Sequence, residues 1–209
     1  MPPMPPLPPG VRHTPQPALI HRDDSLLAVV DLQPHFFEPR IREDPAYAQA
    51  HARAVWVARV AAALGVPAIV TEEDSARNGS TSAEVTAALG GDVPTFDKPV
   101  FGLADCEPIL AALEGASRGT IALIGFETDV CVAHSAVGLL AAGFRAVVVA
   151  DACYSPSSAH EWGLRRVADA GAEIVHAKGL YYEWIRNLAV SRDFEGTHPE
   201  LADPPGFSL

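Results

Sequence analysis

The chain has 209 residues, of which 48% are hydrophobic and 20% charged, and its formal net charge is −11 at pH 7. This aliphatic content excludes intrinsic disorder over most of the chain, and the length fits one compact domain. The apolar runs are shorter than the roughly 20 residues of a membrane-spanning helix, so no membrane partner is expected. The excess of acidic residues argues against a nucleic-acid partner, because phosphate binding needs lysine and arginine.

The first 17 residues hold eight of the 19 prolines. Such a stretch lacks backbone donors and favours extended conformations, so it is predicted to lie outside the core. We expect an N-terminal arm over residues 1–22, a body over 23–195 and a C-terminal tail over 196–209. An arm with no core of its own indicates a neighbouring subunit, and therefore a homo-oligomer (a dimer or a tetramer). A disordered tail is the ordinary alternative, and an SH3-type ligand belongs to a non-enzymatic hypothesis that the lack of basic residues before Arg12 weakens.

Strands and helices are predicted to alternate along the body. In chain order, aliphatic runs bounded by turn residues predict strands, and apolar residues at helical spacing predict helices. The expected strands are 26–32, 67–71, a weaker edge run at 94–98, 120–126, 146–151 and 173–176, and the expected helices are 47–64, 107–113, 131–142, 159–170 and 181–190. This order predicts an α/β fold with a mostly parallel sheet covered on both faces, whose ligands bind beyond the carboxyl ends of the strands.

Three of these strand ends carry chemically active groups. Asp31 ends the run LLAVVD, Lys98 ends the weaker strand, and Cys131 begins a helix after IALIGFETDV. A helix N-terminus and a nearby lysine stabilise a thiolate, so we expect a lowered pKa for Cys131. A carboxylate can take the thiol proton, and free backbone N–H groups at a strand-to-helix turn can bind an oxyanion. The combination indicates an acyl-transfer site.

Each of these residues also has an ordinary structural interpretation. Asp31 could cap the turn that follows its strand, Lys98 could be a surface lysine, and Cys131 could be a packing residue. Their joint occurrence at strand ends is what favours catalysis. Cys106 and Cys153 lack such surroundings and are interpreted as structural. Three cysteines form no disulfide framework, and no secretory signal precedes the body, so a cytoplasmic location is expected.

The segments VVDLQPHF, FDKPVFG and GFETDVCVAHSAVGLLAAGFRAVVVADA, in this order and spacing, resemble the isochorismatase-like cysteine hydrolases over roughly residues 26–184. That family includes nicotinamidases and N-carbamoylsarcosine amidase. The resemblance implies a three-layer, Rossmann-like fold with a six-stranded sheet. It also implies Asp31 as general base, Lys98 as the charge-stabilising lysine and Cys131 as nucleophile. A cis peptide would join Phe126 to Glu127, and the N–H groups of Glu127 and Cys131 would form the oxyanion hole.

This sequence lacks some residues that are typical of the family, and their absence narrows the functions that we expect. Nicotinamidases carry an Asp-x-His pair and further histidines that bind a metal, whereas here the second strand ends VTEED without a histidine. Glu73 or Asp74 could be a weak ligand, but solvated or loop-capping acids are the preferred interpretation. The histidines show no ligand spacing, so no metal and no cofactor are expected. Phe36 and Phe101 follow two of the strand ends and are candidates for the substrate pocket, although either could belong to the core.

The leading hypothesis is therefore a hydrolase that cleaves a C–N bond in a small amide, carbamoyl or ureido compound through a thioester. One alternative is ether hydrolysis of the isochorismatase type, which some relatives without the cysteine perform. Another is a non-enzymatic scaffold with this fold. A dinucleotide-binding protein is disfavoured, because no G-x-G-x-x-G motif follows the first strand. The identity of the substrate does not follow from the sequence.

Overall fold

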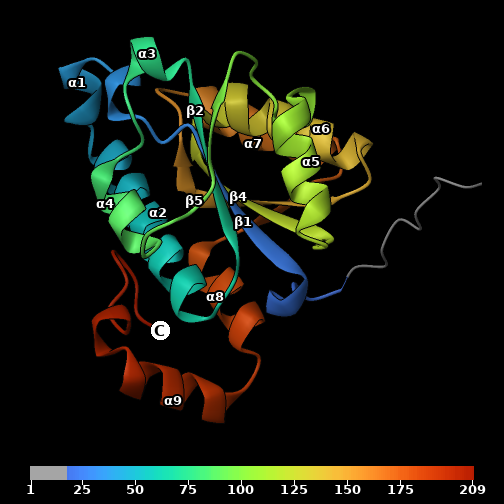
Figure 1. Ribbon diagram of the computed structural model, residues 1–209. Coiled ribbons are helices and arrows are strands. Elements are labelled where there is room, and N and C mark those ends of the chain that lie inside the picture. The colour runs from blue at the N-terminus through green and yellow to red at the C-terminus, as the bar shows by residue number, and fades with distance from the viewer. Residues whose placement is uncertain (1–17) are drawn as a thin grey trace, which may run out of the picture.

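The computed structural model describes residues 18–209, which contain a six-stranded sheet with helices on both faces (Figure 1). All strand pairs are parallel, and the spatial order is β3-β2-β1-β4-β5-β6. The strands are β1 (Ser25–Val30), β2 (Ala68–Glu73), β3 (Thr95–Lys98), β4 (Thr120–Phe126), β5 (Arg145–Tyr154) and β6 (Glu173–Val175). The predicted α/β fold is confirmed, including the short edge strand at β3.

Two groups of helices cover the sheet. The longer helices are α2 (Pro45–Ala63), α5 (Glu107–Gly115), α6 (Ala133–Ala141), α7 (Ala159–Asp169), α8 (Ala177–Ile185) and α9 (Leu188–Thr197), and the short ones are α1 (Pro39–Arg42), α3 (Ser75–Asn78) and α4 (Ala83–Ala88). Helices α2, α4, α8 and α9 share one apolar cluster with the sheet, and α5, α6 and α7 share the other. Within residues 18–209, no helix combines the length and apolarity needed to cross a membrane.

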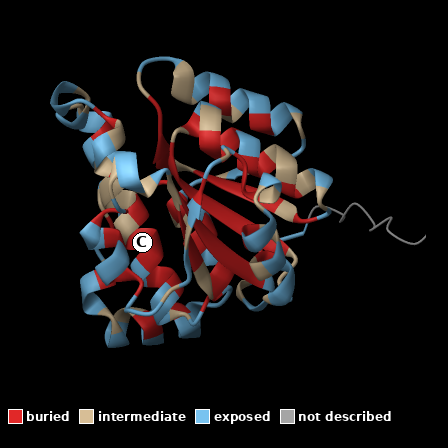
Figure 2. Cartoon of the chain, turned by 45° about the horizontal axis from the view of Figure 1, so that its top comes forward, coloured by how far each residue is buried: buried red, intermediate tan, exposed pale blue. Residues whose placement is uncertain are grey.

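The central strands supply both halves of the core, as Figure 2 shows by their burial. All six residues of β1 are buried. Because successive side chains of a strand point to opposite faces, Leu27 and Val29 pack in the α2 cluster, whereas Leu26, Ala28 and Val30 pack in the α6 cluster. A strand buried on both faces reads as a continuous aliphatic run, which explains why β1 was recognisable in the sequence.

The prediction of a single helix over 181–190 is wrong. The structure has two helices there, α8 and α9, because Arg186 adopts a left-handed conformation (φ 66°) that ends α8. Asn187 then begins α9 by accepting hydrogen bonds from the backbone N–H groups of Ala189 and Val190. The helix predicted over 131–142 also begins differently, because a π-helical turn, Thr128–Val132, precedes α6.

The two chain ends contact the body where they are described. Residues 1–17 of the proposed arm lie outside the described residues, but Ile20 is fully buried. At the other end, the expected tail over 196–209 begins inside α9 and then packs against α2. Leu201 is buried there, and its carbonyl accepts a hydrogen bond of 3.0 Å from the Trp56 indole.

Candidate active site

The strand order reverses between β1 and β4, which makes this the switch point where parallel sheets bind ligands. The C-terminal ends of the strands lie on the side of the sheet next to α3, at the top of Figure 1. Asp31 follows β1, Glu73 ends β2, Lys98 ends β3 and Cys131 lies in the turn after β4. The fold therefore places all four side chains at one edge of the sheet.

Asp31 and Lys98 form an ion pair of 2.6 Å between Oδ2 and Nζ, with both side chains fully buried. The other Asp31 oxygen accepts a hydrogen bond of 2.8 Å from the Thr71 hydroxyl. The Lys98 ammonium also donates to the carbonyls of Val100 and Phe101, at 2.9 and 3.1 Å. These contacts satisfy the ammonium within the protein and hold it against the carboxylate. Lys98 is therefore not a surface lysine, and the Asp31 side chain pairs with Lys98 and Thr71 instead of capping the turn after its strand.

The surroundings of Asp31 shift its acidity in two opposing directions. Burial raises the pKa of the Asp31 carboxyl above its usual range, whereas the Lys98 charge and the hydrogen bonds to the carboxylate lower it, and burial prevails. The carboxylate is therefore a stronger base than an exposed aspartate. Its backbone has a φ of 47°, a left-handed conformation that aspartate and asparagine tolerate better than most residues.

Cys131 lies in the Thr128–Val132 turn, which is held closely against the sheet. Gly125 of β4 has a φ of 132°, and a Cβ there would lie 1.9 Å from the Val30 carbonyl oxygen, so only glycine fits. Gly163 of α7 similarly allows α7 to approach the backbone of Asp129. The Ser135 hydroxyl donates to the Cys131 carbonyl at 2.5 Å. The position of the thiol is thus fixed by close backbone packing.

The Cys131 thiol faces two carboxylates. It donates a hydrogen bond of 3.2 Å to Oε2 of Glu73, and its sulfur lies within 4.8 Å of a ligand oxygen of both Asp31 and Glu73. Burial raises the pKa of the thiol, the Asp31 charge raises it further, and Lys98 lowers it only in part. The expected lowering of this pKa is wrong, because the helix-start argument left out burial and the facing carboxylate. The resting group is a neutral thiol.

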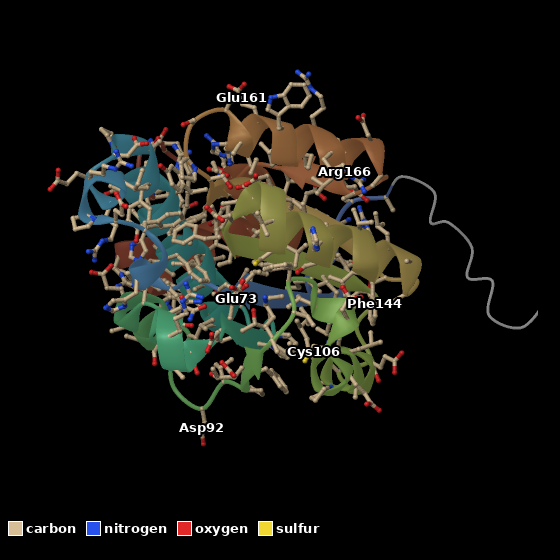
Figure 3. The ribbon with its side chains drawn as sticks, turned by 90° about the horizontal axis from the view of Figure 1, so that it is seen from above. Glu73, Asp92, Cys106, Phe144, Glu161 and Arg166 are labelled. Carbon is tan, nitrogen blue, oxygen red and sulfur yellow. The ribbon has the colours of Figure 1, made fainter. Side chains whose placement is uncertain are left out.

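Glu73 is a site residue that the sequence analysis underrated. Gln33, which is fully buried, fixes the end of β2 through a hydrogen bond from the Glu73 N–H (2.8 Å) and one to the Glu73 carbonyl (3.2 Å). Glu73 is labelled near the middle of the view in Figure 3. Asp74, by contrast, is exposed. Glu73 ends a strand beside β1 and β3, and this position was the available signal.

The chain passes from β4 into the turn at Phe126 and Glu127. The peptide bond between Phe126 and Glu127 is cis. The Phe126 ring is buried, with its centroid 5.4 Å from that of Phe37. Burial raises the pKa of the Glu127 carboxyl, and the nearby charges of Asp129 and Glu73 raise it further. Glu127 therefore adds a further carboxyl group close enough to Glu73 and Asp129 for their charges to interact.

The two aromatic candidates for the pocket differ in their surroundings. Phe101 is 49% exposed, and its ring contacts His134 at a centroid distance of 5.6 Å. Phe101 follows the Lys98 strand, and its backbone carbonyl accepts a hydrogen bond from the Lys98 ammonium. Phe36 is half-buried and packs against the core on the α2 side. Of the two, Phe101 is the better placed for a ligand.

The chemistry of the donor set bears on metal binding. Asp31, Glu73 and Cys131 are the described residues that could together hold an ion. However, the Lys98 ammonium already lies on the Asp31 carboxylate, and a metal would also require loss of the thiol proton, which burial disfavours. The set therefore fits a metal poorly. Cys106, half-buried, and Cys153, buried, lie outside this set.

Comparison with known proteins identifies the family. The family model described as "Isochorismatase domain" matches residues 25–178. Among curated proteins, mouse isochorismatase domain-containing protein 2A is 28% identical over 183 residues, covering 87% of this chain and 81% of its own length. The residues that the family model matches include every strand of the sheet, and also Asp31, Glu73, Lys98 and Cys131.

Two solved structures are similar in fold. The MAR1 ribonuclease from Caenorhabditis elegans superposes with a TM-score of 0.78 at 23% identity, covering 92% of this chain and 98% of that one. The YcaC gene product from Escherichia coli, described as an octameric hydrolase of unknown specificity, gives a TM-score of 0.75 at 22% identity, covering 90% and 95%. From the domain match, the fold and the site together, the chain belongs to the isochorismatase family and is a hydrolase.

Proposed function

We propose that this hydrolase cleaves the C–N bond of a small amide, carbamoyl or ureido compound through a thioester on Cys131. The observation that carries the proposal is a buried thiol that faces a carboxylate which is itself paired with a buried lysine. This arrangement supplies a nucleophile, a base for its proton and a cation that stabilises the site as charge moves. No cofactor is required for these steps.

In the first half of the reaction, Asp31 takes the thiol proton as the sulfur attacks the carbonyl carbon. The carbonyl oxygen becomes an oxyanion, which the backbone N–H groups of Glu127 and Cys131 bind. As the C–N bond breaks, Asp31 returns the proton to the leaving nitrogen, and ammonia or an amine departs. Because the resting thiol is neutral, proton transfer and attack are coupled, and Asp31 acts as a general base.

In the second half, water enters the position that the leaving group has vacated. Asp31 accepts a proton from this water as its oxygen attacks the thioester. The C–S bond then breaks, the carboxylic or carbamic acid is released, and the sulfur regains the proton from Asp31. The free enzyme is restored with the Lys98 ion pair intact. Phe101, exposed beside His134, is proposed to contact the apolar part of the substrate.

Two measurements test this proposal. The first is ammonia release from a panel of small amides and ureides, compared between the native chain and Cys131→Ser. The second is intact mass after quenching during turnover, which should show an acyl adduct that maps to Cys131. Hydrolysis that survives Cys131→Ser undiminished would exclude the thioester. Release of an alcohol from a vinyl ether, without any amide hydrolysis, would favour the isochorismatase-type alternative.

A nucleic-acid substrate, suggested by the name of the ribonuclease neighbour, is less well supported. The chain carries 26 acidic and 15 basic Lys and Arg residues. Lys98, the lysine at the candidate site, is fully buried and paired with Asp31. RNA binding depends on cations that neutralise phosphates, and a lysine that is buried and paired with a carboxylate is not available for this.

Oligomerisation belongs to the same proposal. Several large apolar side chains are exposed, among them Leu188 (74%), Trp162 (63%) and Leu19 (58%). Subunit contacts commonly cover exposed apolar side chains, and the structurally similar YcaC gene product is described as octameric. We propose a homo-oligomer in which the N-terminal arm contributes to the interface. Light scattering of the full chain and of a chain lacking residues 1–17, over a dilution series, tests this assignment.

A further inference from the structure

The Glu73 carboxylate has no task in the mechanism above, although it contacts the nucleophile. Oε2 of Glu73 accepts the hydrogen bond from the Cys131 thiol at 3.2 Å, and among the described residues the thiol is the donor that this carboxylate has. The thiol carries one hydrogen but faces two acceptors, Asp31 and Glu73. Once Asp31 takes this proton, Glu73 is left beside the sulfur without a donor.

Leaving a half-buried carboxylate without a donor is costly, and a negative charge next to a developing oxyanion is more so. A substrate can remove both costs if it brings N–H groups or a positive charge to Glu73. Gln33 holds the backbone of Glu73 on both sides, through the N–H and the carbonyl. The backbone at the end of β2 is therefore fixed, and the hydrogen bond from the thiol holds the carboxylate beside Cys131.

The carboxylates around Glu73 also favour a positively charged ligand over a negatively charged one. Glu127 and Asp129 lie close enough for their charges to interact with each other, and Glu127 also senses Glu73. Within residues 18–209, none of these three carboxylates forms an ion pair. His160 is hydrogen-bonded to the Thr128 hydroxyl at 2.8 Å, and burial lowers its pKa, so it adds no positive charge at neutral pH. Arg166 lines a cavity together with Asp129, so its positive charge acts on that carboxylate rather than on Glu73.

We propose that Glu73 is a specificity-determining residue, which binds N–H groups of the substrate and selects cationic over anionic carbonyl compounds. This inference rests on the proposed function, because it assigns a substrate class to the same nucleophile. The expected substrate is an amide or ureide that carries an ammonium or a similar cationic group near the scissile bond. Carboxylate-bearing amides are disfavoured by repulsion from Glu73, and further by Glu127 and Asp129.

Alkylation of Cys131 by small reagents of different charge tests the inference without requiring turnover. The reagents are iodoacetate (anionic), iodoacetamide (neutral) and 2-bromoethylamine (cationic). The rate at the Cys131 peptide is measured by mass spectrometry and divided by the rate with N-acetylcysteine, which removes intrinsic reactivity. In the native chain, we expect the normalised rates to rise from iodoacetate to iodoacetamide to 2-bromoethylamine, with about tenfold or more between the extremes.

Glu73→Gln removes the charge and keeps the shape and the acceptor. It should reduce the ratio between the cationic and anionic reagents by about tenfold, while Asp74→Asn leaves that ratio nearly unchanged. Asp74 is a matched control, because it is the next residue, it is exposed, and its φ of 43° suits asparagine. The two variants lose the same formal charge, so only a local effect separates them.

Three outcomes would overturn the inference. In the first, Glu73→Gln changes all three normalised rates by one common factor, as a purely structural role predicts. In the second, Asp74→Asn shifts the ratio as much as Glu73→Gln, which assigns the effect to overall charge. In the third, Cys131 of the native chain reacts with iodoacetate at a normalised rate equal to or above that with 2-bromoethylamine. Failure of the proposed function is separate, because an absence of amide hydrolysis leaves these alkylation ratios measurable.

Turnover gives a second measurement once amide hydrolysis is detected. The two amides β-alaninamide and succinamate have similar length and opposite charge. We expect kcat/KM to favour β-alaninamide, and Glu73→Gln to reduce this preference by lowering kcat/KM for β-alaninamide and raising it for succinamate. A preference for succinamate in the native chain would contradict the assignment of substrate class, while leaving amide hydrolysis itself intact.

Discussion

The Lys98 ammonium lies 2.6 Å from the Asp31 carboxylate, and both side chains are fully buried. The two partners are not equivalent within this pair. Lys98 keeps hydrogen bonds to two backbone carbonyls, whereas Asp31 has a pKa that burial raises despite the lysine. The folded protein therefore tolerates a neutral group at position 31 better than an unpaired charge there. Replacing Asp31 and replacing Lys98 should therefore change the stability of the protein by different amounts.

Asp31→Asn should abolish most of the activity without unfolding the chain. Asparagine cannot accept the thiol proton, and loss of a general base typically reduces the rate by at least ~10²-fold. The amide is neutral and tolerates the left-handed backbone at this position, and Lys98 keeps its two carbonyl acceptors, so the thermal midpoint should fall less than in Lys98→Met. Activity assays paired with thermal unfolding measure both effects. Retained activity with a lower midpoint would instead indicate a structural role for Asp31.

Lys98→Met should cost more stability than Asp31→Asn at neutral pH. It leaves the Asp31 carboxylate buried without its partner, a change that typically destabilises by about 3–5 kcal/mol. The cost should shrink as the pH falls, because protonation of Asp31 removes the uncompensated charge. Urea unfolding of the variant and the native chain at several pH values measures this difference. A cost that is independent of pH would show that Asp31 is not its source.

Activity should decline on the acid side, as pH falls through the raised pKa of Asp31. The group acts as a base only when it is ionised, so protonation removes the acceptor for the thiol proton. The Thr71 hydroxyl donates to the carboxylate and lowers this pKa. Thr71→Val should therefore move the acid limb of the pH profile to higher pH. An acid limb that stays in place in this variant would assign the titration to another group.

Much of the fold could be predicted because the central strands are buried on both faces. β1 and β4 read as aliphatic runs, and their ends locate Asp31 and the Cys131 turn. The break at Arg186 could not be predicted from periodicity, because a left-handed residue other than glycine leaves the apolar pattern intact. Asn187, a common N-cap residue, was the available indication of a second helix.

The candidate site could be predicted in its residues more readily than in its electrostatics. Asp31, Lys98 and Cys131 stand at strand ends, which the chain order reveals. The contact of Glu73 with the thiol depends on how Gln33 anchors the end of β2, a contact between residues 40 positions apart. The raised thiol pKa likewise depends on burial by neighbouring elements. Such effects come from tertiary packing and have no local signature in the sequence.

Dialysis against a chelator should leave the activity unchanged. The carboxylate that a metal would use is paired with Lys98, and the thiol is protonated at rest. Elemental analysis of the purified protein, before and after dialysis, provides the parallel measurement. Stoichiometric zinc or iron that is lost together with the activity would contradict the mechanism proposed here.

Leu201→Ala should destabilise the protein without affecting the chemistry of Cys131. Leu201 is buried in the α2 cluster, and its carbonyl accepts the hydrogen bond from the Trp56 indole, so this end of the chain completes the core. Truncating a buried leucine typically lowers the free energy of unfolding by about 2–5 kcal/mol. Because the mutated side chain belongs to a different part of the fold from the carboxyl ends of the strands, normalised alkylation of Cys131 below the unfolding transition should match that of the native chain.

Glu200→Gln, an exposed neighbour on the same turn, serves as the control and should leave the midpoint of urea unfolding unchanged. Equal midpoints for Leu201→Ala and the native chain would mean that the Leu201 side chain contributes no stability to this cluster.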